Sequence, residues 1–233
     1  MAKQKYAEAR VLTAKDLMDR YSTNTRQRTY LQLIQNNTLV LAMGPAGTGK
    51  TFTAALYAAS ALLQDVNTEV VITRPYASCG KTMGFNTGSL VEKITPFLLP
   101  LLAYFDKFLG AENARNLLGS KRIRIEPLET IRGQNFDNTI IIADEMQSAD
   151  IASIQALTTR IGKNSKLIVA GDPRQNDLMG KSIDGVTYLA RILDKYSIRD
   201  SAVFVFTEDD ILEAASVGIL SLPLTATGGT HNA

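Results

Sequence analysis

Short runs of consecutive apolar residues recur along the chain, separated by longer segments in which apolar residues come every three or four positions. A run rich in Val, Ile and Leu, with no polar alternation, is typical of a strand buried on both faces of a parallel sheet. The predicted strands of this kind are residues 38–43, 69–73, 139–143, 166–170 and 202–206. Residues 122–126 alternate charged and apolar side chains, which predicts a strand at the edge of the sheet or with one exposed face.

The segments between these strands have helical periodicity. The predicted helices are residues 25–35, 52–63, 90–109, 151–161, 185–193 and 208–220. Strands and helices that alternate in this way predict an α/β fold, with helices on both faces of a mostly parallel, doubly wound sheet. We expect one domain over residues 24–222, an arm or short helix at 1–23, and a flexible tail at 223–233.

The composition fits one globular domain and argues against several other classes of protein. Of the 233 residues, 45% are hydrophobic and 21% are charged, which is enough apolar material for one sizeable core. The formal net charge is only +2, so any surface for nucleic acid has to be a local patch. The single cysteine, Cys79, cannot form an internal disulfide and disfavours a zinc site. No apolar run approaches the roughly 18 residues of a membrane span, so we expect a cytoplasmic protein without a membrane partner.

The stretch from Gly44 to Thr51 is the most informative motif in the chain. It follows a predicted strand, precedes a helix, and matches the pattern G-x-x-x-x-G-K-[ST] at every constant position. Glycines let backbone N–H groups turn toward a phosphate, Lys50 reaches the β- and γ-phosphates, and Thr51 holds Mg²⁺. The residues predicted to cradle a nucleotide are Gly44, Pro45, Ala46, Gly47, Thr48, Gly49, Lys50 and Thr51. A glycine-rich turn that binds nothing is the alternative, and the strand-loop-helix context disfavours it.

Two carboxylates, Asp144 and Glu145, follow the apolar run 139–143. The carboxyl ends of strands are where ligands gather in open α/β sheets. Downstream of a phosphate-binding loop, this pattern is a Walker B element, in which Asp144 binds Mg²⁺ through its water shell and Glu145 orients the attacking water. The alternative is a helix N-cap followed by an acidic residue in the first turn.

Two glutamines are candidates for contacts with the nucleotide. Gln175 follows the next buried strand, where its amide can touch the γ-phosphate, and Arg174 is beside it. The alternative for this segment is a β-turn built by residues 171–173. Gln27 lies near the start of the helix that leads into the phosphate-binding loop, and its paired donor and acceptor suit adenine. An ordinary exposed helix residue is the alternative there.

Residues 76–88 predict a long loop with several glycines. Long loops in compact domains are commonly functional, although a simple surface excursion is an equal alternative. Within this loop Lys81 and Phe85 offer a charge and a stacking face to RNA or single-stranded DNA.

In combination these motifs resemble the PhoH family of P-loop ATPases, which is related to the ATPase core of superfamily 1 helicases. The resemblance covers about residues 24–220 and favours the functional interpretation of Gln27 and Gln175. Besides the motifs above, it rests on Thr-Arg-Pro at 73–75, Met-Gly-Phe at 83–85, Gln147, Thr-Arg-Ile-Gly at 159–162 and Gly-Asp-x-x-Gln at 171–175.

The resemblance implies Mg²⁺-dependent ATP hydrolysis coupled to RNA or single-stranded nucleic acid. Lys50, Glu145 and Gln175 are the predicted catalytic residues. Thr51 and Asp144 are the predicted metal-binding residues.

An arginine finger from a neighbouring subunit suits a domain that leaves one face of the nucleotide open. Arg160 and Arg174 are the candidates, and a hexameric ring is the expected homo-oligomer. Glu213 stands where the family usually has an arginine, which favours the alternative of a nucleotide-gated scaffold with little turnover. A kinase is a further alternative, and the acidic pair 144–145 together with Gln175 argues against it.

Overall fold

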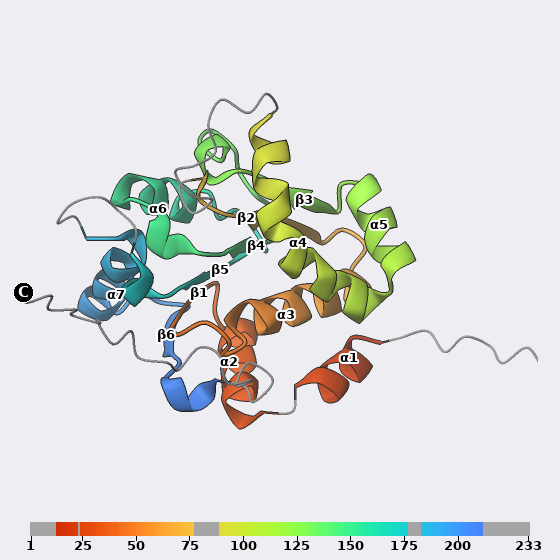
Figure 1. The fold of residues 1–233 in the computed structure, drawn as a ribbon, viewed down its shortest axis with the longest axis horizontal. Helices are drawn as coiled ribbons and strands as arrows, with labels where there is room; N and C mark the ends of the chain where they lie inside the picture. Colours follow the sequence, from red (N-terminus) through yellow and green to blue (C-terminus); the bar gives the residue numbers. More distant parts are fainter. Residues whose placement is uncertain (1–12, 23, 77–88, 177–182, 212–233) are drawn as a thin grey trace, which may run out of the picture.

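The structure, a computed structural model, describes residues 13–22, 24–76, 89–176 and 183–211. Within them, six strands form one sheet in the order β3-β2-β4-β5-β1-β6 (Figure 1). The strands are β1 (Leu39–Met43), β2 (Glu69–Thr73), β3 (Ile123–Ile125), β4 (Thr139–Ala143), β5 (Lys166–Gly171) and β6 (Ser201–Val205). All neighbouring strands pair in parallel, which confirms the predicted α/β fold, and β3 is an edge strand as its alternating pattern predicts.

The strand register brings the carboxyl ends of three central strands to one edge of the sheet. Met43 at the end of β1 pairs with Gly171 at the end of β5. Ala143 at the end of β4 pairs with Val169 of β5. The phosphate-binding loop, the acidic pair and the turn at 172–175 each follow one of these strands. They therefore emerge side by side.

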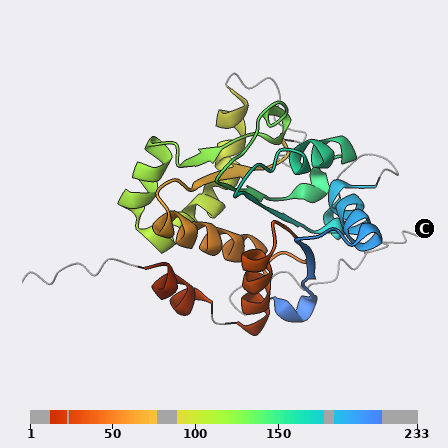
Figure 2. The ribbon, with the colours of Figure 1, turned by 180° about the vertical axis from the view of Figure 1, so that it is seen from behind.

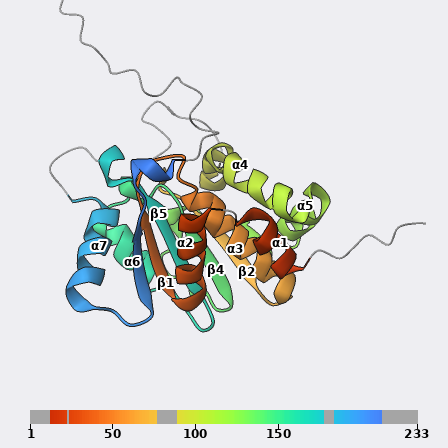
Figure 3. The same cartoon turned by 90° about the horizontal axis from the view of Figure 1, so that it is seen from below.

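Helices cover both faces of the sheet, and Figure 3 shows the resulting three layers. The helices of one face are α1 (Ala14–Tyr21), α2 (Thr25–Asn36), α3 (Lys50–Gln64), α4 (Leu90–Leu109) and α5 (Ala111–Gly119). The other face carries α6 (Ile151–Thr158) and α7 (Gly185–Tyr196). Successive strand residues enter opposite cores, since Ile142 packs in the first core and Ile141 in the second. Burial on both faces is the reason why the strands are apolar at consecutive positions.

Helix α3 is the element on which the first layer is assembled. Its inward face is lined by alanines that are fully buried, Ala54, Ala55, Ala58 and Ala59. Side chains this small let the helix axis lie close to the sheet. Helices α1, α2 and α4 pack against α3 in turn, and Figure 2 shows α1 and α2 beside it from behind.

Helix α7 runs to Tyr196, three residues further than predicted, and the observed helices differ from the predicted ones at three other places. The chain between the predicted helix 90–109 and the edge strand contains a further helix, α5, which starts after Gly110 at a φ of 84°. Helix α6 ends at Thr158, because residue 161 turns away to bridge with Phe136. The predicted closing helix is wrong at its start: Glu208–Asp210 is a 3-10 turn closed by a capping box from Thr207. Residues 212–220 lie outside the described part of the chain.

Among the described helices, none is by itself long and apolar enough to cross a membrane. Helices α4 and α5 meet that criterion only as a pair, with a bend of 118° between them.

Replacing Ile142 tests the central packing. Its side chain is fully buried, in register with Ile72 of β2 and Ile168 of β5. We expect Ile142→Ala to lower the free energy of unfolding by about 2–5 kcal/mol, the range for truncating a large core side chain. Val203→Ala, at a partly exposed edge-strand position, is the control and should cost much less. Urea unfolding followed by circular dichroism measures both, and equal losses would contradict this account of the core.

Candidate nucleotide-binding site

All three glycines of the phosphate-binding loop have a positive φ, and that of Gly47 is 81°. Gly44 and Gly49 have φ values of 138° and 87°, which side-chain-bearing residues rarely adopt. A Cβ atom at Gly44 would lie 2.4 Å from the carbonyl oxygen of Phe206, and one at Gly49 would lie 2.3 Å from Nε2 of Gln27. The loop is therefore pressed between its neighbours and cannot accept side chains at either position.

Lys50 is folded back inside this loop and is only 9% exposed. Its ammonium donates hydrogen bonds of 2.7 Å to the carbonyl oxygens of Gly44 and Pro45. Burial lowers the pKa of Lys50, and the negative charge of Asp144 partly opposes this shift. The cation is thus held at the loop by neutral partners, which an anion entering the loop can replace because a phosphate adds opposite charge to the hydrogen bond.

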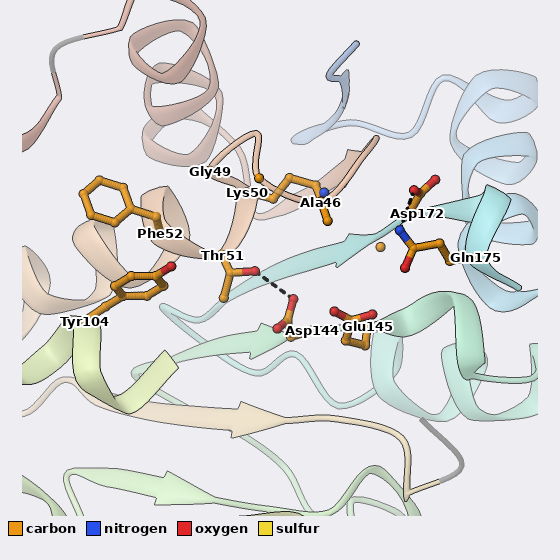
Figure 4. Close-up of a pocket in the computed structure, with 12 residues that line it drawn as sticks. Ala46, Gly49, Lys50, Thr51, Phe52, Tyr104, Asp144, Glu145, Asp172 and Gln175 are labelled. Atoms are coloured by element: carbon orange, nitrogen blue, oxygen red, sulfur yellow. Dashed lines mark hydrogen bonds between the residues drawn. The ribbon is translucent and has the colours of Figure 1, made fainter. Parts of the chain in front are cut away.

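Thr51 and Asp144 are brought together from two different motifs. The Thr51 hydroxyl donates a 2.9 Å hydrogen bond to Oδ1 of Asp144 (Figure 4). Burial, and secondly the negative charge of Glu145, raises the pKa of the Asp144 carboxyl, while the bond from Thr51 opposes the shift. A hydroxyl and a carboxylate are oxygen ligands of the kind that Mg²⁺ prefers. A divalent cation here would offset a negative charge that the fold otherwise buries at a cost.

Glu145 is held by a glutamine that motif matching gives no role. Glu145 has a left-handed backbone with φ of 55°, and its Oε2 accepts a 2.6 Å hydrogen bond from Nε2 of Gln147. Oε1 of Gln147 accepts the backbone N–H of Asp172 at 3.1 Å. Gln147 is 3% exposed, so one buried amide ties the acidic pair to the turn after β5. Neither Asp144 nor Glu145 caps a helix with its side chain, because Asp150 caps α6.

The turn after β5 is both a structural turn and the support of a glutamine that lines the cavity. Asp172 caps the 3-10 turn Pro173–Gln175 by accepting the N–H of Arg174 at 3.1 Å. Its other oxygen accepts Nε2 of Gln175 at 3.1 Å, so the glutamine is held by the turn while it lines the cavity beside Lys50. Arg174 does not line the cavity; its guanidinium donates to Glu208 at 2.8 Å, and its Nε lies 3.4 Å from Oδ1 of Asp172.

The remaining predicted residues lie at different depths. Gln27 is 4% exposed and packs on Gly49, and its Nε2 has no hydrogen-bond partner among the described residues. Its burial removes the alternative of an exposed helix residue. Arg160 lies where the chain enters β4, since its carbonyl oxygen accepts the N–H of Phe136 at 3.1 Å, and it does not line the cavity. Lys81, Phe85 and Glu213 lie outside the described residues.

A cavity of about 250 Å³ joins these groups. Figure 4 shows Glu145, Asp172 and Gln175 on one side of Thr51, and two aromatic rings on the other. The residues lining the cavity are Ala46, Gly47, Gly49, Lys50, Thr51, Phe52, Tyr104, Asp144, Glu145, Gly171, Asp172 and Gln175. Sequence reasoning missed Phe52 and Tyr104 as site residues, because aromatic side chains at helical spacing are typical of a core.

The parallel sheet, the loop after β1 and the acidic pair after β4 define a P-loop NTPase. A family model described as PhoH-like protein matches residues 21–220. The chain therefore belongs to the PhoH-like protein family.

Curated relatives share more than a third of their aligned residues with this chain. A PhoH-like protein of Synechocystis is 38% identical over 168 residues, which are 72% of this chain and 51% of the relative. A PhoH-like protein of Bacillus subtilis is 36% identical over 176 residues, 70% of this chain and 55% of the relative. Protein PhoH of Escherichia coli K12 is 34% identical over 157 residues, which are 66% of this chain and 44% of the relative. The chain spans about half the length of these relatives.

Two solved structures align at low similarity. The helicase domain of Hef from Pyrococcus furiosus has a TM-score of 0.47 at 12% identity, over 82% of this chain and 39% of its own. The Pif1 helicase of Candida albicans has a TM-score of 0.39 at 17% identity, over 79% of this chain and 39% of its own. Both likenesses are too distant to bear on function.

Replacing Asp144 tests the cost of its buried charge. The pKa of Asp144 lies above its ordinary value in the folded protein, so its ionised form opposes folding at neutral pH. We expect Asp144→Asn to raise the thermal unfolding midpoint in EDTA at pH 7, since asparagine still accepts the Thr51 hydroxyl. The exposed Asp194→Asn is the control and should leave the midpoint unchanged. A lower midpoint for Asp144→Asn would contradict the burial argument.

Proposed function

We propose that this protein hydrolyses ATP with Mg²⁺. The observation that carries the proposal is the 2.9 Å hydrogen bond between Thr51 and Asp144, which joins two motifs far apart in sequence. Lys50 and Glu145 line the same cavity as this pair. The residues proposed to bind Mg²⁺, to bind phosphate and to act as the general base therefore surround one cavity.

Each side chain has a separate task in phosphoryl transfer to water. Lys50 exchanges its two loop carbonyls for β- and γ-phosphate oxygens, and Thr51 and Asp144 hold Mg²⁺. Bound Mg²⁺ supplies neutralisation of the negative charge that develops on the phosphates. Glu145, oriented by Gln147, accepts a hydrogen bond from the attacking water and aligns it. Gln175 contacts the γ-phosphate from the turn after β5.

Gln27 remains the candidate for reading adenine. Its buried Nε2 has no hydrogen-bond partner in the described part of the chain, which supports a polar contact with a ligand, because such groups are costly when nothing satisfies them. We propose that nucleotide binding supplies that partner.

Coupling to RNA or single-stranded DNA and assembly into a hexameric ring extend the proposal. Support for a finger from a neighbouring subunit comes from Arg174, which is 57% exposed and pairs with the 76% exposed Glu208. An ion pair this exposed is weak, and the second contact of Arg174, from its Nε to Oδ1 of Asp172, is long at 3.4 Å, so Arg174 can exchange both for a phosphate on another subunit. Arg160 is the second candidate, with its Nε buried.

Phosphate release from ATP with Mg²⁺ tests the proposed hydrolysis. We expect Lys50→Ala and Glu145→Gln each to lower turnover by at least about 100-fold, because one removes charge stabilisation and the other the general base. The matched controls are the exposed Lys163→Ala and Glu112→Gln, which should keep wild-type turnover. RNA or single-stranded DNA should raise the wild-type rate. Tight ATP binding without wild-type turnover would instead support a nucleotide-gated scaffold.

Mixing inactive variants tests a finger supplied in trans. A ring of Lys50→Ala and Arg174→Ala subunits contains interfaces with an intact phosphate-binding loop on one side and an intact Arg174 on the other. We therefore expect the mixture to recover part of the turnover that each variant lacks. Lys50→Ala mixed with Glu145→Gln is the control and should recover none, since both defects lie in one subunit's site. A wild-type protein that sediments as a monomer at full turnover would contradict the ring.

A further inference from the structure

The end of the cavity beyond Thr51 is closed by two aromatic side chains. Phe52 directly follows Thr51 on α3, and Tyr104 reaches the cavity from α4. The ring centroids are 5.3 Å apart with an interplanar angle of 87°, an edge-to-face pair. Both side chains are only partly buried, so each keeps surface toward the cavity.

Other side chains hold this pair from behind. The fully buried Phe108 lies 5.1 Å from Phe52 and 6.3 Å from Tyr104, measured between ring centroids. Tyr21 of α1 is 6.5 Å from Phe52, and the Lys107 ammonium lies 5.3 Å from the Phe52 centroid. Three helices thus fix the rings in place before any ligand arrives.

The two ends of the cavity are lined by different kinds of side chain. Glu145 and Gln175, which would meet the γ-phosphate, lie on the far side of Thr51 from Phe52 and Tyr104 (Figure 4). Lys50 and Thr51 lie between these ends and hold the β- and γ-phosphates. A triphosphate laid along the loop therefore ends, at its α-phosphate, beside the two rings.

We propose that Phe52 and Tyr104 form the wall on which the nucleoside of the bound nucleotide packs. The inference rests on the proposed function, because that function orients the triphosphate. Aromatic faces stack on any base, so this wall adds affinity without choosing between bases. Burial, and secondly the charge of Asp144, raises the pKa of Tyr104, which keeps its phenol neutral beside the phosphates.

A ligand without a nucleoside separates this wall from the phosphate cradle. The experiment compares Mg²⁺–ATP with Mg²⁺–tripolyphosphate by isothermal titration calorimetry. We expect Phe52→Ala and Tyr104→Ala each to weaken ATP binding roughly 5- to 150-fold, the effect of losing one base-stacking ring. Tripolyphosphate binding should stay unchanged, which also shows that the variants are folded. Tyr104→Phe should bind ATP like the wild type.

Two further variants complete the design. Lys50→Ala should weaken both ligands, because it acts on phosphates alone. Tyr188→Ala removes a half-buried ring from α7, on the opposite face of the sheet, and should change neither. Equal losses of ATP and tripolyphosphate, or no loss of either, in Phe52→Ala and Tyr104→Ala would overturn the wall alone. A wild-type protein that binds neither ligand would overturn the proposed function and the wall with it.

Discussion

The parallel register of β1, β5 and β4 is the constraint on which the site depends. Strand β5 lies between the other two, so the phosphate-binding loop and the acidic pair come from strands that are not neighbours. The 2.9 Å contact between Thr51 and Asp144 forms only because all three strands end at one edge. The turn after β5 then fills the space between the two motifs, where Gln147 binds it.

This convergence places charge where water is scarce. Burial raises the pKa of Asp144 and lowers the pKa of Lys50. Their hydrogen-bond partners are a hydroxyl and backbone carbonyls rather than each other. A site built in this way is unfavourable for folding, and the proposed function would offset that cost with a phosphate and a divalent cation, a common exchange of stability for function.

The aromatic cluster at the other end of the cavity shows how the first layer serves the site. Phe108 belongs to the hydrophobic core, yet it also supports two rings that line the cavity. Tyr21 of helix α1 belongs to this cluster. It is the only residue of α1 that lies within the region matched by the family model. The same contacts therefore pack the core and position the rings that line the cavity.

The sequence by itself determined the strands, the edge position of β3, the phosphate-binding loop and the acidic pair. These features are local: apolar runs report burial on both faces, and motif spacing reports backbone shape. Only the tertiary structure decided the bridging role of Gln147, the burial of Gln27 against Gly49, and the meeting of Phe52 and Tyr104 at the cavity. It also decided helix α5 and the 3-10 turn at Glu208–Asp210. Each of these depends on which distant segments meet, and neither hydrophobic periodicity nor motif spacing carries that information.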